Sequence, residues 1–208
     1  MKKWPINLVI LFIFSLSCLP AFAAPSWRGT QGSTFQQWSF WDSSTSPSPD
    51  AGYVNPFGTP SLFIGDRAAW SLSVDSYTGV WATKTDEMDL QIPNNTATGD
   101  GTEKTIWAEI TWKVAGLVAR IPDSLMVNVD PEDSYTTINF THSDTSLGNG
   151  WFSTVMIVDI WPNPTSEWII VKGDIYIDEI TIDTQCIPEP ATIMLLTLGG
   201  LFLRKRKA

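Results

Sequence analysis

The chain is poor in the residues that most metal and nucleophile sites use. It has one histidine, His142, and two cysteines, Cys18 and Cys186, among 208 residues. A single histidine excludes a histidine metal cluster, and no Gly-x-Ser-x-Gly motif is present for a serine hydrolase. Phosphate-binding glycine motifs and Cys-x-x-Cys metal sites are also missing. Most catalytic constellations are therefore absent from the sequence, and we expect a protein that is not an enzyme.

Hydrophobic runs are concentrated at the two ends of the chain. Lys2 and Lys3 precede an apolar stretch over residues 6–14, and Ala21 and Ala23 supply the small residues that a signal peptidase reads. We predict a signal peptide over residues 1–23, with cleavage after Ala23. A lipoprotein signal through Cys18 is the weaker alternative, because Ser15 stands where a leucine is expected.

The C-terminal segment, residues 187–208, combines three features in a fixed order. Pro188, Glu189 and Pro190 come first and predict a rigid, extended spacer that cannot join a sheet. Residues 191–203 are uncharged and predict a helix of about 20 Å, which is short against a hydrocarbon core of about 30 Å. A basic cluster follows, formed by Arg204, Lys205, Arg206 and Lys207.

This order resembles the PEP-CTERM sorting signal of exported bacterial proteins. The resemblance implies recognition by a membrane-embedded exosortase, and signal peptidase is the other partner expected during export. It also implies a transient association of the C-terminal helix with the inner membrane, and a destination at the cell surface or in the extracellular matrix. Whether the tail is cleaved or kept as an anchor stays open.

Positive charge is scarce between the two signals. Residues 24–186, which we predict to form one domain, hold seven of the 13 lysines and arginines and 21 of the 22 acidic residues. The resulting charge near −14 disfavours nucleic acid, whose phosphates would repel it. Cys186 is the only cysteine beyond the leader, so no internal disulfide is expected. Cys186 is either an incidental linker residue or a site of lipid or thiol chemistry.

The pattern of this domain is that of an all-β protein. Short runs rich in Val, Ile, Thr and Trp alternate with Gly, Pro, Asn, Asp and Ser, and helical periodicity is missing. We predict an antiparallel β-sandwich with a long Pro-rich loop over residues 43–60 and a second loop over residues 93–103. The expected strands cover residues 34–40, 69–74, 88–92, 106–114, 125–129, 136–140, 154–160, 167–172 and 175–182.

Tryptophan is unusually frequent in the predicted domain. Of 11 tryptophans only Trp4 lies in the leader, and most of the others are expected in the core. Trp107 falls on the polar face of its strand, Trp41 stands at the start of the Pro-rich loop, and Trp151 follows a Gly-Asn-Gly turn. These three are the candidates for stacking on a sugar ring.

The segment from Tyr176 to Ile180 resembles the last strand of carbohydrate-binding jelly rolls. Its apolar phase shifts at Asp178 and Glu179, which predicts a β-bulge there. The resemblance implies a jelly-roll, galactose-binding-like sandwich in which Asp178, with Glu179, helps to hold a structural calcium ion. The interpretation of these residues as two exposed acids at a strand end stays open beside it.

Several segments, among them Trp27 to Thr30 and Asn55 to Gly58, look like a group of PEP-CTERM proteins from planctomycete-type bacteria for which no activity is established. The hypothesis for the body is a non-catalytic matrix component that contacts exopolysaccharide through exposed tryptophan. The alternative is a secreted glycoside hydrolase that uses a carboxylate pair, although no spacing selects one.

Overall fold

The computed structural model describes residues 24–84, 86–94, 102–115, 125–129, 136–164 and 166–188. These residues form strands, turns and loops, and none of them lies in a helix long and apolar enough to cross a membrane. The strands are β1 (Ser33–Trp38), β2 (Ser61–Ile64), β3 (Ala69–Val74), β4 (Tyr77–Ala82), β5 (Glu87–Pro93), β6 (Thr102–Val114), β7 (Leu125–Val129), β8 (Thr136–Gly148), β9 (Trp151–Trp161), β10 (Ser166–Lys172) and β11 (Ile175–Pro188).

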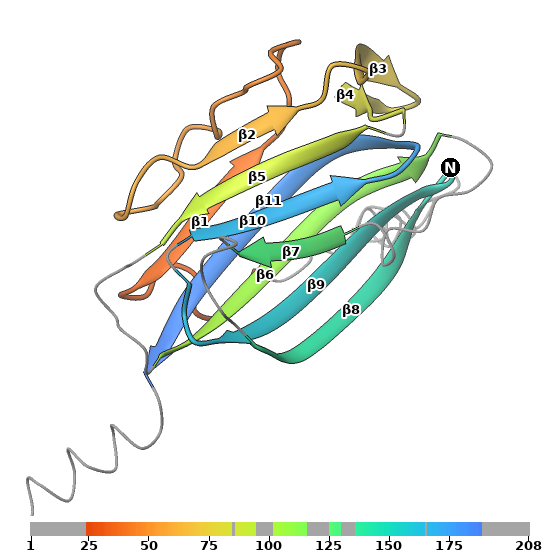
Figure 1. Ribbon diagram of the computed structural model, residues 1–208. Coiled ribbons are helices and arrows are strands. Elements are labelled where there is room, and N and C mark those ends of the chain that lie inside the picture. The colour runs from red at the N-terminus through yellow and green to blue at the C-terminus, as the bar shows by residue number, and fades with distance from the viewer. Residues whose placement is uncertain are drawn as a thin grey trace, which may run out of the picture.

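The larger sheet is organised around its last strand, β11. Its order is β3-β4-β11-β6-β9-β8, and β1 also pairs with β11. One edge of β11 pairs with β6 along its whole length, while the other edge pairs first with β4 and then with β1. All of these pairings are antiparallel, and Figure 1 shows the first and last strands side by side. Segments from both ends of the domain therefore meet in one sheet.

A second sheet, in the order β2-β5-β10-β7, covers one face of the first. Alternate residues of both sheets point into one shared core, for example Ile110 and Ile180 from the larger sheet and Leu90 and Ile169 from the smaller one. Each of these four side chains is 0 % exposed, and burying one such side chain stabilises the fold by about 1.5–3 kcal/mol. The architecture is sandwich-like, and its core lies between the layers.

The all-β prediction is confirmed, and so is the long loop between β1 and β2. Two short strands, β2 and β4, were not predicted. The prediction that the Pro-rich spacer cannot join a sheet is wrong at its start, because Ile187 and Pro188 pair with Glu103 and Thr102 of β6. Proline is tolerated there because it ends the strand. The jelly-roll type stays a prediction, and both predicted terminal helices lie outside the described residues.

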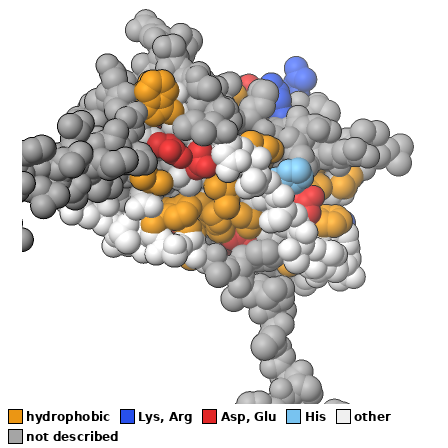
Figure 2. Space-filling model, turned by 90° about the horizontal axis from the view of Figure 1, so that it is seen from below, with side chains coloured by type: hydrophobic (Ala, Val, Ile, Leu, Met, Phe, Trp, Pro, Cys, Tyr) orange, Lys and Arg blue, Asp and Glu red, His pale blue; other side chains and the backbone are white. Residues whose placement is uncertain are grey.

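The sheet edge formed by β8 and the end of β9 presents two aromatic side chains to solvent. Phe140 is 46 % exposed, and Trp161 at the end of the neighbouring β9 is 40 % exposed. Figure 2, a view from below, shows a group of hydrophobic side chains with acidic side chains next to it. His142, the single histidine of the chain, lies within β8 and is exposed.

Candidate functional site

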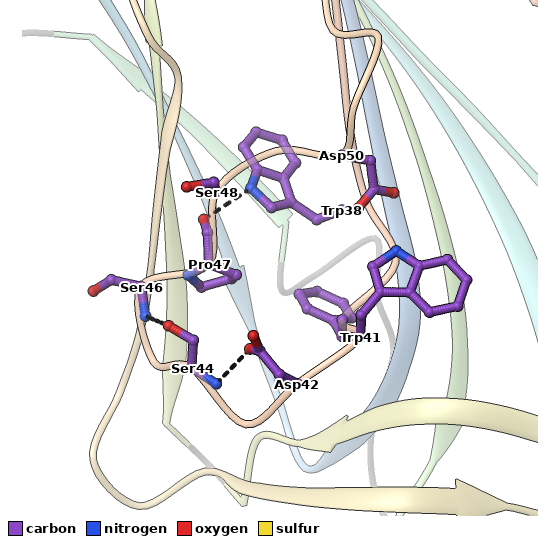
Figure 3. Close-up of a pocket in the computed structure, with 9 residues that line it drawn as sticks. Trp38, Trp41, Asp42, Ser44, Ser46, Pro47, Ser48 and Asp50 are labelled. Atoms are coloured by element: carbon purple, nitrogen blue, oxygen red, sulfur yellow. Dashed lines mark hydrogen bonds between the residues drawn. The ribbon is translucent and has the colours of Figure 1, made fainter.

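A pocket of about 290 Å³ opens in the loop that follows β1. Its apolar lining comes from Trp38, Phe40, Trp41 and Pro47, and its polar lining from Asp42, Ser44, Ser46, Ser48 and Asp50. Figure 3 shows the loop curving around the pocket, with the serines on one side and Trp41 on the other. The lining therefore combines aromatic surface with hydroxyl and carboxylate groups.

Hydrogen bonds tie the later part of this loop segment, at Pro47 and Asp50, to β1 and to Ser39 directly after it. The indole Nε1 of Trp38 donates to the carbonyl oxygen of Pro47 at 3.2 Å, which Figure 3 marks with a dashed line. The amide of Asp50 donates to the carbonyl oxygen of Gln37 at 2.7 Å. The hydroxyl of Ser39 donates to the Asp50 carboxylate at 2.6 Å. The pocket is thus largely pre-formed, as small-molecule sites usually are.

Of the three tryptophans predicted to stack on glycan, Trp41 alone is freely exposed. Its exposed fraction is 79 %, against 5 % for Trp107 and 0 % for Trp151. The prediction of an exposed ring is therefore wrong for Trp107 and Trp151. Trp41 also lines the pocket, so the structure brings the stacking candidate and the polar side chains of the loop together.

Trp107 lies on the predicted face of its strand, the face away from the core, but it is not exposed as predicted. Its neighbours Ile106 and Ala108 belong to the core, so its own ring points to the outer face of the larger sheet. There the guanidinium of Arg28 lies 5.9 Å from the ring centroid. Arg28 comes from the segment before β1, and an ion pair with Asp183 holds it in place. The N-terminal segment therefore covers a face that the strand pattern alone leaves open.

Trp151 joins two hairpins and is not available to a ligand. Its Nε1 donates to the Asp75 carboxylate at 2.9 Å, and its ring stacks on Tyr77 with centroids 4.0 Å apart. Asp75 also pairs with Lys113 at 2.7 Å. These contacts fix the turn between β3 and β4 onto β6 and β9, which makes the role of Trp151 structural.

The predicted bulge in β11 is confirmed, since the register with β6 shifts between Ile177 and Glu179. The Glu179 carboxylate accepts a hydrogen bond from Gln37 Nε2 at 2.7 Å. Within the described ranges, no group of three or more His, Cys, Asp or Glu side chains is arranged to hold a metal ion. A calcium ion at Asp178 would need further oxygen ligands beside these two acids, and it stays a prediction.

The raised pKa of the Asp178 carboxyl group should make the stability of the fold depend on pH. Burial, with a contribution from the neighbouring Glu179, raises this pKa from 3.8 to about 7. Between about pH 4 and pH 7 the folded state keeps a proton that the unfolded state has lost, so stability should fall as pH rises through this window. We expect a melting temperature that declines from pH 4 to about pH 7 and a flatter profile for Asp178→Asn. Parallel profiles for the two proteins would contradict this assignment.

The structure also contains a buried polar cluster that sequence reasoning missed. The side chains of Lys104 in β6 and Glu167 in β10 are both 0 % exposed, and their charged atoms lie 3.2 Å apart. Asn94, directly after β5, accepts a hydrogen bond from Lys104 Nζ at 2.7 Å and donates one to Glu167 Oε1 at 2.9 Å. The cluster connects the two sheets at one end of the sandwich.

Cys186 borders this cluster and belongs to the folded body. It pairs with Lys104 in the sheet, and its sulfur lies 3.8 Å from Lys104 Nζ. The prediction that Cys186 is a linker residue is therefore wrong. Burial raises the pKa of its thiol, although the nearby Lys104 opposes this rise, so Cys186 is a weak nucleophile.

Comparison with known proteins identifies the C-terminal segment. Residues 187–207 match the family model of the PEP-CTERM protein-sorting motif, as the sequence predicted. The motif marks an exported protein that an exosortase sorts toward the cell surface. Its first residues, Ile187 and Pro188, lie in β11, while Glu189, Pro190 and the basic cluster lie outside the described residues, as do Ala21 and Ala23. No curated protein and no solved structure matches the chain.

Proposed function

We propose that this exported protein is a non-catalytic component of the cell surface or extracellular matrix that binds glycan weakly through the loop pocket. The observation that carries the proposal is Trp41, a large aromatic ring that is 79 % exposed at the rim of a pre-formed pocket. An exposed indole offers a flat apolar surface that fits the C–H face of a sugar ring.

The remaining lining suits the polar edge of the same ligand. Carboxylates from Asp42 and Asp50 and several serine hydroxyls accept or donate hydrogen bonds to sugar hydroxyls. The volume of about 290 Å³ lies just below the range for ligand pockets, roughly 300–1,000 Å³, so we expect the pocket to hold no more than one or two sugar units. Affinity from one such site is modest, so many copies in a matrix would act through avidity.

Substitution of Trp41 tests the proposal. In calorimetric titrations against cell-wall and secreted polysaccharides, Trp41→Ala should lose about 1 kcal/mol of binding free energy, roughly a fivefold loss of affinity. Trp161→Ala is the matched control, because this ring is also exposed but does not line the pocket. Equal binding by the two variants, or no heat from the unmodified protein with any glycan, would rule the pocket out as a glycan site.

The carboxylate pair in the pocket keeps a glycoside hydrolase as the second candidate. Asp42 and Asp50 line one cavity, as a pair of catalytic acids must. A reducing-sugar assay over a polysaccharide panel separates the candidates. Sustained release that Asp50→Asn abolishes would favour the hydrolase, and its absence would favour the binding protein.

A further inference from the structure

We propose that Lys104 and Asn94 become joined by an intramolecular isopeptide bond, with Glu167 as the proton-transferring group. The bond would link the end of β5 in the smaller sheet to the start of β6 in the larger sheet. It would be a covalent staple between the layers of a domain that has no disulfide within its described residues.

The three groups are placed as this reaction requires. Lys104 Nζ lies 2.7 Å from Asn94 Oδ1, and because a C=O bond is about 1.23 Å long, the amine is roughly 3–4 Å from the amide carbon. This separation is that of a near-attack geometry. The side chains of Lys104 and Glu167 are 0 % exposed and Asn94 is 5 % exposed, so bulk water does not compete for the amide carbon.

The amide of Asn94 is held with its oxygen toward the lysine. Its nitrogen donates to the carbonyl oxygen of Pro164 and to Asn163 Oδ1, both at 2.5 Å, as well as to Glu167. Its oxygen Oδ1 accepts from Lys104 Nζ at 2.7 Å and from the Cys186 thiol at 3.7 Å. The leaving nitrogen therefore lies next to the carboxyl group that must supply its proton.

Glu167 is suited to moving the proton. Burial raises the pKa of its carboxyl group, although the Lys104 charge opposes this rise. Among the described residues its second oxygen, Oε2, is buried and has no hydrogen-bond partner. A buried carboxylate with an unpaired oxygen is costly, and transfer of a proton from the ammonium of Lys104 to Glu167 removes both charges from the core. The same transfer frees the lone pair of Nζ for attack.

The reaction is a balanced transamidation. The neutral amine of Lys104 attacks Cγ of Asn94, a C–N bond forms, and the carbonyl π electrons move to Oδ1. Glu167 gives its proton to the amide nitrogen and takes one from the attacking nitrogen. Collapse of the adduct breaks the bond between Cγ and Nδ2 and releases ammonia. The product is a secondary amide, with no change in oxidation state and no co-reactant.

Peptide mapping of the full-length chain tests the bond directly. Asp100 lies between the two joined residues in sequence, so an Asp-specific endoprotease acting on denatured protein cuts the connecting segment before it. We expect the two pieces that carry Asn94 and Lys104 to stay joined, at their summed mass less one ammonia. Two separate pieces would overturn the proposal, and a separate Asn94 piece lighter by ammonia would show cyclisation of the asparagine alone.

Three variants test the roles of the residues. Lys104→Met and Glu167→Gln should both give separate pieces, whereas Lys113→Met, outside the cluster, should give the joined species. Joined pieces in Glu167→Gln would overturn the role of Glu167. Peptide mapping of the unmodified chain decides whether the bond between Lys104 and Asn94 is present, even if a core variant fails to fold.

Discussion

Replacing Arg28 with methionine is expected to lower the free energy of unfolding by about 2–3 kcal/mol, less than for a fully buried ion pair because the Arg28 side chain is 31 % exposed. The Asp183 side chain is 0 % exposed, and Arg28 binds both of its oxygens, at 2.7 Å through Nε and 2.6 Å through Nη2. The same guanidinium lies 4.2 Å from the Phe35 ring, so the change also removes packing over aromatic side chains. Urea denaturation measures the loss.

The double variant Arg28→Met with Asp183→Asn is the informative control. Asparagine keeps the shape of the buried side chain but carries no charge, so the double variant should be more stable than Arg28→Met alone. A double variant that is no more stable would mean that the unpaired charge is not the cause, and that the loss comes from packing over Phe35 and Trp107.

The second large effect is expected at Gly79 in β4. An added Cβ at this position would collide with the carbonyl oxygen of Phe40, which is backbone and cannot turn aside. The φ angle of Gly79 is +73°, which costs a non-glycine residue roughly 1–2 kcal/mol by itself. The collision should add about 1–3 kcal/mol to the destabilisation of Gly79→Ala. Because Phe40 lines the pocket, glycan binding should weaken as well.

Gly52→Ala separates the two contributions to that loss. Gly52 lies in the loop between β1 and β2, which also contains Phe40. Its φ angle is +101°, and nothing lies within 4 Å of the position that a Cβ would take there. Thermal unfolding should therefore show the smaller, backbone-only loss for Gly52→Ala and the larger loss for Gly79→Ala. Similar losses would mean that the loop moves away from β4 without difficulty.

Strands with a clear two-residue period were predictable from sequence. The predicted bounds of β3 and β7 are those of the structure, and the inward residues of β6 follow the predicted face. β2 was missed because it has four residues, which gives too little alternation to read. β4 was missed because a glycine such as Gly79 normally argues against a strand. Gly79 is needed in β4 because the carbonyl oxygen of Phe40, far away in sequence, leaves no room for a side chain.

Long-range contacts explain what the sequence could not predict about the site. Arg28 and Asp183 are 155 positions apart, so no local pattern shows that Trp107 is covered. Trp41 was found because it stands at the start of the Pro-rich loop, which the sequence predicted to lie at the surface. The buried cluster did carry a signal: Lys104 has the inward phase of Ile106, and Glu167 has that of Ile169. Two opposite charges with inward phase on different strands predict a buried pair.

The central place of β11 also has a kinetic consequence. The larger sheet cannot be completed until residues 175–188 are available, because β11 pairs with β1, β4 and β6. Contacts between such distant segments make folding slow relative to local structures. During export the emerging chain therefore stays incompletely folded until the residues directly before the sorting motif have passed. The first residues of that motif, Ile187 and Pro188, are themselves part of β11, so the larger sheet can close along its full length only once the motif has begun to emerge.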